Sequence, residues 1–278
     1  MPGTLFVVAT PIGNLEDVTM RALRVLREVE AVAAEDTRRT GLFLQHFGIT
    51  TPTISLHDHN ERAKTPALVE RLVSGASVAL VSDAGTPLLS DPGLRLVRAA
   101  HDAGVPVVPV PGASAITAAL SISGVPVNTF TFLGFAPARA AERDRWLEGV
   151  KDVAHTLVYF EAPHRIRESL EAVGRVLGDR FVVVARELTK LHESVARGWL
   201  SSILETGVEE RGELTIVVSD LIKPADTVRT APTDEVVRAE FGVLTKNDGL
   251  SGKDAATRLA LKYGLSRQQI YKVVSQHD

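Results

Sequence analysis

The chain of 278 residues contains no cysteine, which excludes disulfide bonds, thiolate metal sites and a cysteine nucleophile. It has no excess of basic residues either, with 31 Lys and Arg against 34 Asp and Glu, so any binding of nucleic acid must be local. No apolar run approaches the roughly 18 residues of a membrane span, and the first residues lack the basic region of an export signal. These absences predict a soluble cytoplasmic protein.

Several common ligand-binding motifs are also missing. No two glycines are two residues apart, so the dinucleotide fingerprint G-x-G-x-x-G does not occur. Gly207 and Gly212 have the spacing of a phosphate-binding loop, but Glu213 stands where that loop requires lysine. The serine-hydrolase motif G-x-S-x-G and the zinc motif H-E-x-x-H are absent too. The sequence therefore excludes ATPase, kinase and standard NAD-dependent classes.

What the chain does contain is organised around residues 78–93. Four apolar residues with valine at both ends predict a buried strand, and a cluster of Gly, Pro and Asp follows at once. A helical apolar pattern then begins at Leu94. A strand, a rigid loop and a helix in this order place ligands at the carboxyl edge of an α/β sheet. The alternative is an ordinary long connection built from common turn residues.

The first half of the chain repeats this alternation of strand and helix. Each expected strand ends in a polar cluster, which predicts an α/β domain, residues 1–120, with a doubly wound parallel sheet. Its expected strands are residues 5–9, 31–34, 53–56, 78–81 and 106–110. Its expected helices are residues 18–29, 41–47 and 94–103, a helix that follows Glu61 and runs to about Val73, and an alanine-rich helix after Ala115.

The second half predicts a second α/β domain and a small helical one. The second domain, residues 121–221, has expected strands at 129–134, 156–160, 180–187 and 213–219 and expected helices at 141–150 and 163–177. A linker at 224–233 then leads to a helical domain, residues 234–278, with helices at 234–243, 252–263 and 267–276.

The helical domain has a local excess of three positive charges from Lys246 onward. Ala260 precedes Gly264 by four residues, a spacing typical of a helix-turn-helix, with Ile270 and Val273 on the buried side of the second helix. This pattern predicts an RNA-binding module. The alternative is a plain helical hairpin that packs on the body or on a dimer partner.

Three further polar clusters follow expected strands. His57, His59 and Glu61 have a spacing that a metal site could use, but no second ligand cluster matches it, so no metal is predicted. Residues 159–165 and 186–190 each add Glu with basic residues at a strand end. They are expected either to contact a ligand or to form a solvated sheet edge.

Taken together, these segments resemble the bacterial ribosomal RNA small subunit methyltransferase I family, in the tetrapyrrole methylase superfamily. The matching motifs are ATPIGNL (9–15), AEDTR (34–38), LHDHNE (56–61), SDAGTP (82–87), SDPG (90–93), PGASA (111–115), YFEAPHR (159–165) and ARELTK (185–190). The resemblance implies 2′-O-methylation of a cytidine ribose in the decoding region of 16S rRNA, on the small ribosomal subunit. It also implies a homodimer, and two α/β domains with S-adenosyl-L-methionine in the cleft between them.

The superfamily pattern implies a set of cofactor-binding residues at the strand ends of both domains. They are Pro11, Asp83, Ala84, Gly85, Thr86, Leu89, Ser114, Ala115, Phe160 and Leu188. The chain departs from relatives that act on tetrapyrroles, because those carry Gly-Pro-Gly-Asp where this chain has Thr10-Pro-Ile-Gly13. The departure favours RNA over a porphyrin-like substrate.

Methyl transfer to a ribose hydroxyl is an in-line displacement that a positioned base assists. The candidate bases are Asp36, His57 and Glu61, and Asp36 leads because it follows a strand beside two arginines. An ion pair of Asp36 with Arg38 or Arg39 is the alternative. The candidate RNA contacts are Arg38, Arg39, Arg165, Lys190, Arg267 and Lys272. Two other functions stay open: a C-methyltransferase on a tetrapyrrole or protein side chain, and a ligand-sensing transcription regulator.

Overall fold

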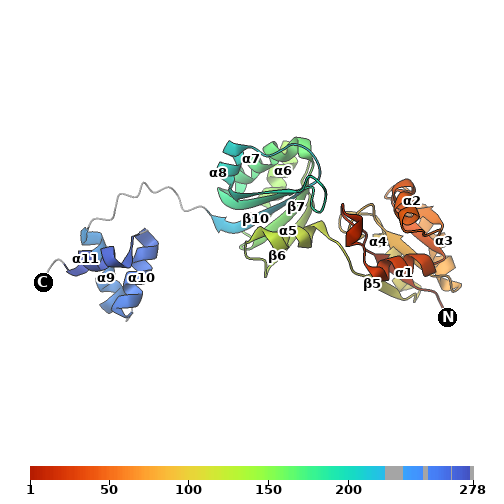
Figure 1. Ribbon diagram of the computed structural model, residues 1–278, viewed down its shortest axis with the longest axis horizontal. Coiled ribbons are helices and arrows are strands. Elements are labelled where there is room, and N and C mark those ends of the chain that lie inside the picture. The colour runs from red at the N-terminus through yellow and green to blue at the C-terminus, as the bar shows by residue number, and fades with distance from the viewer. Residues whose placement is uncertain (223–233, 247–249, 264, 276–278) are drawn as a thin grey trace. The chain divides into compact units, whose positions relative to one another are not determined.

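The computed structural model describes most of the chain (Figure 1). The described residues are 1–222, 234–246, 250–263 and 265–275. The chain divides into two compact units, Met1–Lys223 and Pro224–Asp278. The predicted linker at 224–233 and the predicted turn residue Gly264 lie outside the described residues. In the part that is described, no helix is long and apolar enough to cross a membrane.

The first sheet is parallel, as the sequence predicts, with strand order β3-β2-β4-β1-β5. Neighbouring β2 and β4 are buried along their whole length, which their uninterrupted apolar sequences require. The strands are β1 (Leu5–Val8), β2 (Ala31–Ala34), β3 (Thr53–Ser55), β4 (Val78–Val81) and β5 (Val107–Val110).

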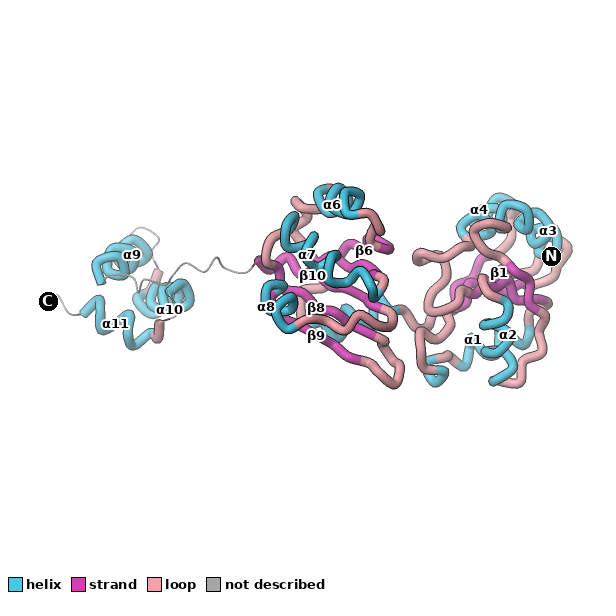
Figure 2. The backbone as a smooth tube through the Cα atoms, turned by 90° about the horizontal axis from the view of Figure 1, so that it is seen from above, coloured by secondary structure: helices cyan, strands magenta, loops and turns pink. Residues whose placement is uncertain are grey.

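Helices cover both faces of this sheet, so the predicted doubly wound arrangement is confirmed. Leu26 and Leu44 pack against one face, and Leu68 and Leu96 pack against the other. Figure 2 shows the two helix layers on opposite sides of the strands. The helices are α1 (Met20–Glu28) and α2 (Thr37–His46) on the first face, and α3 (Glu61–Val73) and α4 (Leu94–Asp102) on the second. A short 3₁₀ turn, η1 (Leu15–Asp17), precedes α1.

The second sheet is mixed, with strand order β6-β7-β10-β8-β9. Only β6 and β7 pair in parallel, and the other neighbours are antiparallel. The strands are β6 (Phe130–Phe135), β7 (Thr156–Glu161), β8 (Arg180–Arg186), β9 (Ser194–Trp199) and β10 (Leu214–Ile222). Strand β9 was not predicted, because this edge strand is half-exposed and carries Arg197 and Gly198 instead of an apolar stripe.

The two faces of the second sheet are covered by different parts of the chain. One face packs under α6 (Ala140–Glu148), α7 (Ile166–Leu177) and α8 (Leu200–Thr206), with η2 (Pro163–Arg165) before α7. The other face packs against α5 (Ala115–Ser123). We call residues 1–114 the first lobe and residues 115–222 the second lobe. The predicted domain boundary after residue 120 falls inside α5.

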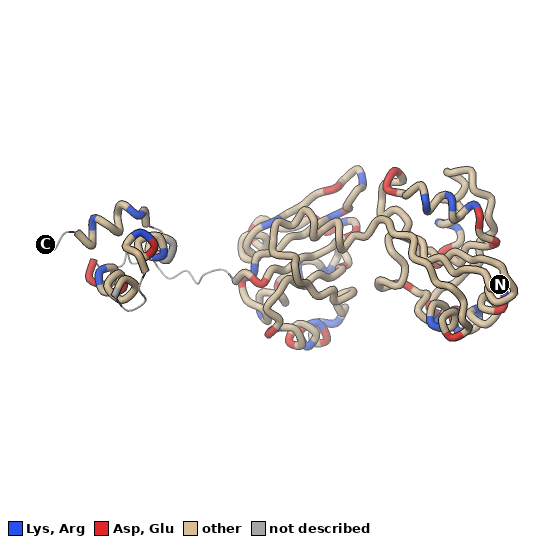
Figure 3. Tube along the Cα trace, turned by 90° about the horizontal axis from the view of Figure 1, so that it is seen from below, with Lys and Arg blue, Asp and Glu red and all other residues tan. Residues whose placement is uncertain are grey.

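The C-terminal unit is a small bundle of α9 (Asp234–Lys246), α10 (Gly252–Tyr263) and α11 (Arg267–Ser275). Val237, Leu259 and Ile270 form its core, so the predicted burial of Ile270 is confirmed. Ser251 and Ser266 cap the last two helices, because each hydroxyl accepts from a backbone N–H three residues on, at 3.2 Å. Figure 3 shows basic and acidic residues interspersed along the helices of this unit.

Candidate functional site

The loops after β1, β4 and β5 lie together at the carboxyl end of the first sheet. Backbone bonds join the first two loops: the Thr10 N–H donates to the Gly85 carbonyl at 2.9 Å, and the Gly85 N–H donates back at 3.0 Å. The Thr86 hydroxyl donates to the Ala113 carbonyl at 3.2 Å, which adds the third loop. Parallel strands bring their ends to one edge, and ligands of open α/β sheets bind there.

The loop after β4 has an unusual backbone. Gly85 has φ +76°, and two residues that are not glycine, Leu88 and Ser90, have φ of 73° and 74°. Such conformations cost on the order of 1–3 kcal/mol each and concentrate at ligand-binding sites. The hydrogen bonds to the neighbouring loops help to hold this strained path in place.

Loops from the second lobe complete the surface. Ile12 packs in one apolar cluster with Ile116 and Leu188. The Asn14 N–H donates to Thr189 Oγ1 at 3.1 Å, and Lys190 lies directly against Gly13. The two lobes therefore contact each other through the loop after β1.

A cavity of about 470 Å³, which we call the inner pocket, lies among these loops. Eight of the ten predicted cofactor residues line it: Asp83, Ala84, Gly85, Thr86, Leu89, Ser114, Ala115 and Phe160. The other two do not. Pro11 lines a neighbouring cavity, and Leu188 is buried in the apolar cluster that includes Ile12. Further lining residues that were not predicted are Glu35, Ser90, Asp91, Phe135, Gly212 and Glu213.

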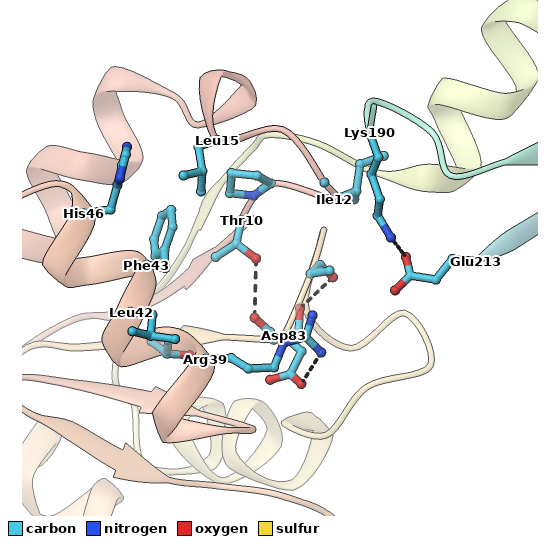
Figure 4. A pocket seen from close by; sticks show the side chains of 15 residues that line it. Thr10, Ile12, Leu15, Arg39, Leu42, Phe43, His46, Asp83, Lys190 and Glu213 are labelled. Carbon is cyan, nitrogen blue, oxygen red and sulfur yellow. Dashed lines mark hydrogen bonds and ion pairs between the residues drawn. The ribbon is translucent and has the colours of Figure 1, made fainter. Parts of the chain in front are cut away.

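A second cavity of about 490 Å³, the side pocket, opens beside the inner one (Figure 4). The two cavities share a wall formed by Ile12, Arg39, Asp83, Ala84 and Glu213. The opposite wall comes from η1 and the outer side of α2. It carries Leu15, Leu42, Phe43 and His46.

The inner pocket is rich in carboxylates. Burial raises the pKa of Asp91 to about 6, and the negative charges of Glu35 and Asp83 act in the same direction. Burial also raises the pKa of Glu35, and the charge of Asp83 adds to the effect. A pocket in which acids crowd together in this way favours a cationic ligand.

Comparison with known proteins identifies the family. The model of the family described as Tetrapyrrole (Corrin/Porphyrin) Methylases matches residues 4–204. Full-length relatives are named Ribosomal RNA small subunit methyltransferase I. The protein from Haemophilus influenzae is 41% identical, covering 100% of this chain and 98% of the relative. The one from Vibrio cholerae is 46% identical, covering 96% and 93%. The chain belongs to the ribosomal RNA small subunit methyltransferase I family.

Solved structures show that the fold is that of tetrapyrrole methylases. Diphthine synthase matches with a TM-score of 0.60 at 18% identity, covering 79% of this chain and 91% of that one. Uroporphyrin-III C-methyl transferase from Thermus thermophilus, in complex with S-adenosylhomocysteine, matches with a TM-score of 0.55 at 20% identity. That match covers 78% of this chain and 97% of the other.

The leading candidate base, Asp36, is engaged by its own helix. Its Oδ1 accepts the Arg38 N–H at 2.8 Å as the N-cap of α2, and its Oδ2 pairs with the Arg38 guanidinium at 2.9 Å. The Arg38 hydrogen bonds hold the pKa of Asp36 down at about 2. A carboxylate with so low a pKa is a weak proton acceptor. The geometry therefore favours the ion pair, the alternative that the sequence left open.

We predict that Asp36→Asn changes turnover by less than about 3-fold, because asparagine caps a helix nearly as well as aspartate. Single-turnover methyl transfer measures this directly. A fall of about 10²- to 10⁴-fold, the usual cost of a lost base, would return Asp36 to the chemistry.

The other two candidate bases line neither pocket. Glu61 is buried, and its Oε1 accepts the backbone N–H groups of Arg95 and Leu96 at 2.7 and 3.3 Å, so it caps α4. His57 lies in the turn before α3, where its backbone N–H donates to Asn60 Oδ1 at 2.9 Å. Among the described residues, no group of three or more His, Asp or Glu is arranged to hold a metal ion.

The candidate RNA-contacting residues differ in the exposure of their side chains and in whether they pair with an acid. The side chain of Arg38 is 88% exposed, and that of Arg39 is 60% exposed although it pairs with Asp83 at 3.0 Å. Arg165 pairs instead with the buried carboxylate of Glu161 at 2.7 Å. Lys190 lies between two acids of its own lobe, at 2.9 Å from Glu187 and 3.1 Å from Glu213. Arg267 and Lys272 are exposed on α11.

Two carboxylates of the inner pocket that were not predicted belong to segments in which other site residues were predicted. Glu35 immediately precedes Asp36, and Asp91 lies in the loop that follows β4. Along an extended chain, neighbouring side chains point to opposite sides. Glu35 and Asp36 therefore face different ways, and Glu35 is the one that lines the inner pocket.

Proposed function

We propose that this chain transfers the methyl group of S-adenosylmethionine to the 2′-hydroxyl of a cytidine in 16S rRNA, acting in the cytoplasm on the small ribosomal subunit. The inner pocket carries the proposal. It lies at the carboxyl edge of a parallel sheet, draws on both lobes and presents several carboxylates. The names of the full-length relatives support rRNA as the substrate.

The residues of the inner pocket fit the methyl donor. S-adenosylmethionine carries a sulfonium and an ammonium group, and Glu35, Asp83 and Asp91 supply opposite charge. Phe135 and Phe160, with ring centroids 5.2 Å apart, offer an aromatic wall for the adenine. Ser114 makes no capping bond with its side chain at the N-terminus of α5, which leaves first-turn N–H groups able to donate to ligand oxygens.

When bound, the cofactor supplies an electrophilic methyl group on its sulfonium. The chain's own task is to hold the ribose hydroxyl in line with that group, which by itself removes much of the barrier. The strained loop after β4 is suited to this task because its hydrogen bonds fix it in advance. Of the carboxylates in the pocket, Glu35 and Asp91 have raised pKa values that suit acceptance of the hydroxyl proton.

Two features support RNA over a pigment as the acceptor. The loop after β1 reads Thr10-Pro-Ile-Gly13 instead of the Gly-Pro-Gly-Asp of relatives that act on tetrapyrroles. The chain also carries the C-terminal bundle, with exposed Arg267 and Lys272. We include in the proposal that this bundle binds rRNA and that the enzyme acts as a homodimer.

Transfer of tritium from labelled S-adenosylmethionine tests the proposal against its rivals. Purified small subunits should become labelled in their RNA, whereas a tetrapyrrole offered in their place should not. Label in the pigment or in a ribosomal protein would favour a C-methyltransferase or a protein methyltransferase. Binding of the cofactor without any transfer would favour a ligand sensor.

We predict that Asp91→Asn weakens cofactor binding at neutral pH and reduces its dependence on pH near pH 6. In the wild type the Asp91 carboxylate ionises as the pH rises through about 6, so affinity for a cation should be full above that pH and fall below it. Calorimetric titrations between pH 5 and pH 8 measure both curves. Parallel curves for the two proteins would remove Asp91 from the cofactor site.

The same substitution should stabilise the free protein. The folded pKa of Asp91 lies above the unfolded value, so its ionisation costs stability as the pH rises through about 6. Asp91→Asn removes this cost, and the expected gain at pH 7 is on the order of 1 kcal/mol because the side chain keeps part of its contact with water. Urea unfolding at pH 7 and pH 4.5 measures the gain, which should be clearly smaller at the lower pH and should vanish only below the unfolded pKa of roughly 3.9.

A further inference from the structure

The side pocket has walls of two different characters. Figure 4 shows Leu15, Phe43 and His46 on one side, and the ion pairs Arg39–Asp83 and Lys190–Glu213 on the other. The apolar wall is open to water: Leu42 is 69% exposed and Leu15 is 39% exposed. Large apolar side chains exposed beside a cavity mark a surface that something covers.

The polar wall is the one that the side pocket shares with the inner pocket. Asp83 and Arg39 belong to both cavities, as does Glu213. A molecule in the side pocket therefore has polar groups of the shared wall at one end, next to the inner pocket. At its other end it contacts an aromatic and aliphatic surface. A nucleoside has this same polarity, with a flat base at one end and a ribose of hydroxyl groups at the other.

We propose that the side pocket holds one unstacked nucleotide of the RNA substrate, with its base against Phe43 and its ribose at the Asp83–Arg39 wall. This inference rests on the proposed function and extends it to the acceptor. Sequence-specific RNA-binding proteins take unpaired bases out of the stack and place them on aromatic side chains. The volume of about 490 Å³ is in the range of cavities that enclose small ligands.

Phe43 is the residue through which the inference is tested. Its ring makes an edge contact with Phe47, with centroids 5.4 Å apart, and packs against the apolar cluster under α2. Phe47 shares that packing but lines neither pocket. The two phenylalanines are therefore a matched pair: each substitution removes a ring from α2 or its end, and only one of them removes a wall of the side pocket.

The experiment compares Phe43→Leu, Phe43→Tyr and Phe47→Leu with the wild type in the full-length protein. Leucine keeps apolar volume but has no flat face, and the expected result for F43L is a fall of about 5- to 150-fold in kcat/KM for small subunits, the range that stacking of one base on an aromatic ring represents. F43Y restores the ring and should recover most of this fall. F47L should keep its kcat/KM, and the calorimetric affinity for S-adenosylmethionine should stay within about 2-fold of wild type in all three.

Four results would overturn the inference. The first is an unchanged kcat/KM in F43L, and the second is an equal loss in F43L and F47L, which would indicate packing alone. The third is a loss of cofactor affinity in F43L, which would assign the side pocket to the cofactor. The fourth is a changed oligomeric state in F43L, which would make the apolar wall an interface between copies. If the wild type methylates no small subunits, the proposed function fails, and this outcome is distinct from all four.

Discussion

Gly85→Val should weaken the binding of S-adenosylmethionine by about 100-fold. Gly85 adopts φ +76°, a conformation that a β-branched residue resists at a cost on the order of 1–3 kcal/mol. A Cβ at this position would also lie 3.2 Å from Ile12 Cγ2, in the wall that the two pockets share. Both effects displace the backbone against which the ligand should lie, and calorimetry measures the loss.

Gly104→Val is the matched control for this substitution. Gly104 has a similar φ of +68°, but nothing lies within 4 Å of a Cβ built on it, and it lines neither pocket. It should lose stability to backbone strain and keep its affinity for the cofactor. A folded G85V protein with wild-type affinity would show that the loop after β4 does not form the cofactor site.

Removal of the C-terminal unit after Lys223 should weaken binding to small subunits by about 10- to 1,000-fold at low salt while leaving cofactor affinity unchanged. The expectation follows from the boundary between compact units at Lys223 and from the separate core of the bundle. For each phosphate that the shortened protein no longer neutralises, the slope of log K against log salt should also become shallower by roughly 0.9. Titrations of labelled subunits at several salt concentrations give both quantities.

A double substitution in the intact chain separates charge from bulk. Arg267→Ala with Lys272→Ala removes two exposed cations of α11, and neither side chain belongs to the bundle core. The slope of log K against log salt should become shallower by up to about 1.8 if both side chains contact phosphates. Equal affinity and equal slope for the truncated, doubly substituted and wild-type proteins would contradict an RNA-binding role for the bundle.

The sequence was most informative about the position of the site. Apolar strands with polar ends predicted a parallel sheet, and parallel strands necessarily bring those ends to one edge. For this reason Asp83–Thr86 and Ser114, which are distant in sequence, line one cavity. The edge strand β9 escaped prediction because half-exposed strands lack the apolar pattern by which buried strands are recognised.

The roles of individual polar residues were harder to predict, because tertiary contacts decide them. Glu61 caps a helix that begins more than thirty residues later in the chain, and no local pattern announces that pairing. Asp36 caps its own helix, which starts at Thr37 and not at residue 41 as predicted. Leu188 was expected at the cofactor, but its side chain is buried in the apolar cluster that joins the lobes and does not line the inner pocket.

Nucleoside analysis of methylated small subunits is the most direct test of the function. The purified protein, S-adenosylmethionine and subunits that lack the modification are incubated together, and the 16S rRNA is digested to nucleosides for mass spectrometry. We expect 2′-O-methylcytidine to appear in proportion to enzyme turnover and, at a cofactor concentration below the wild-type Kd, to form about 100-fold more slowly with the G85V protein. A methyl group on a base, or 2′-O-methylcytidine formed equally well by G85V, would contradict the assignment of the inner pocket to ribose methylation.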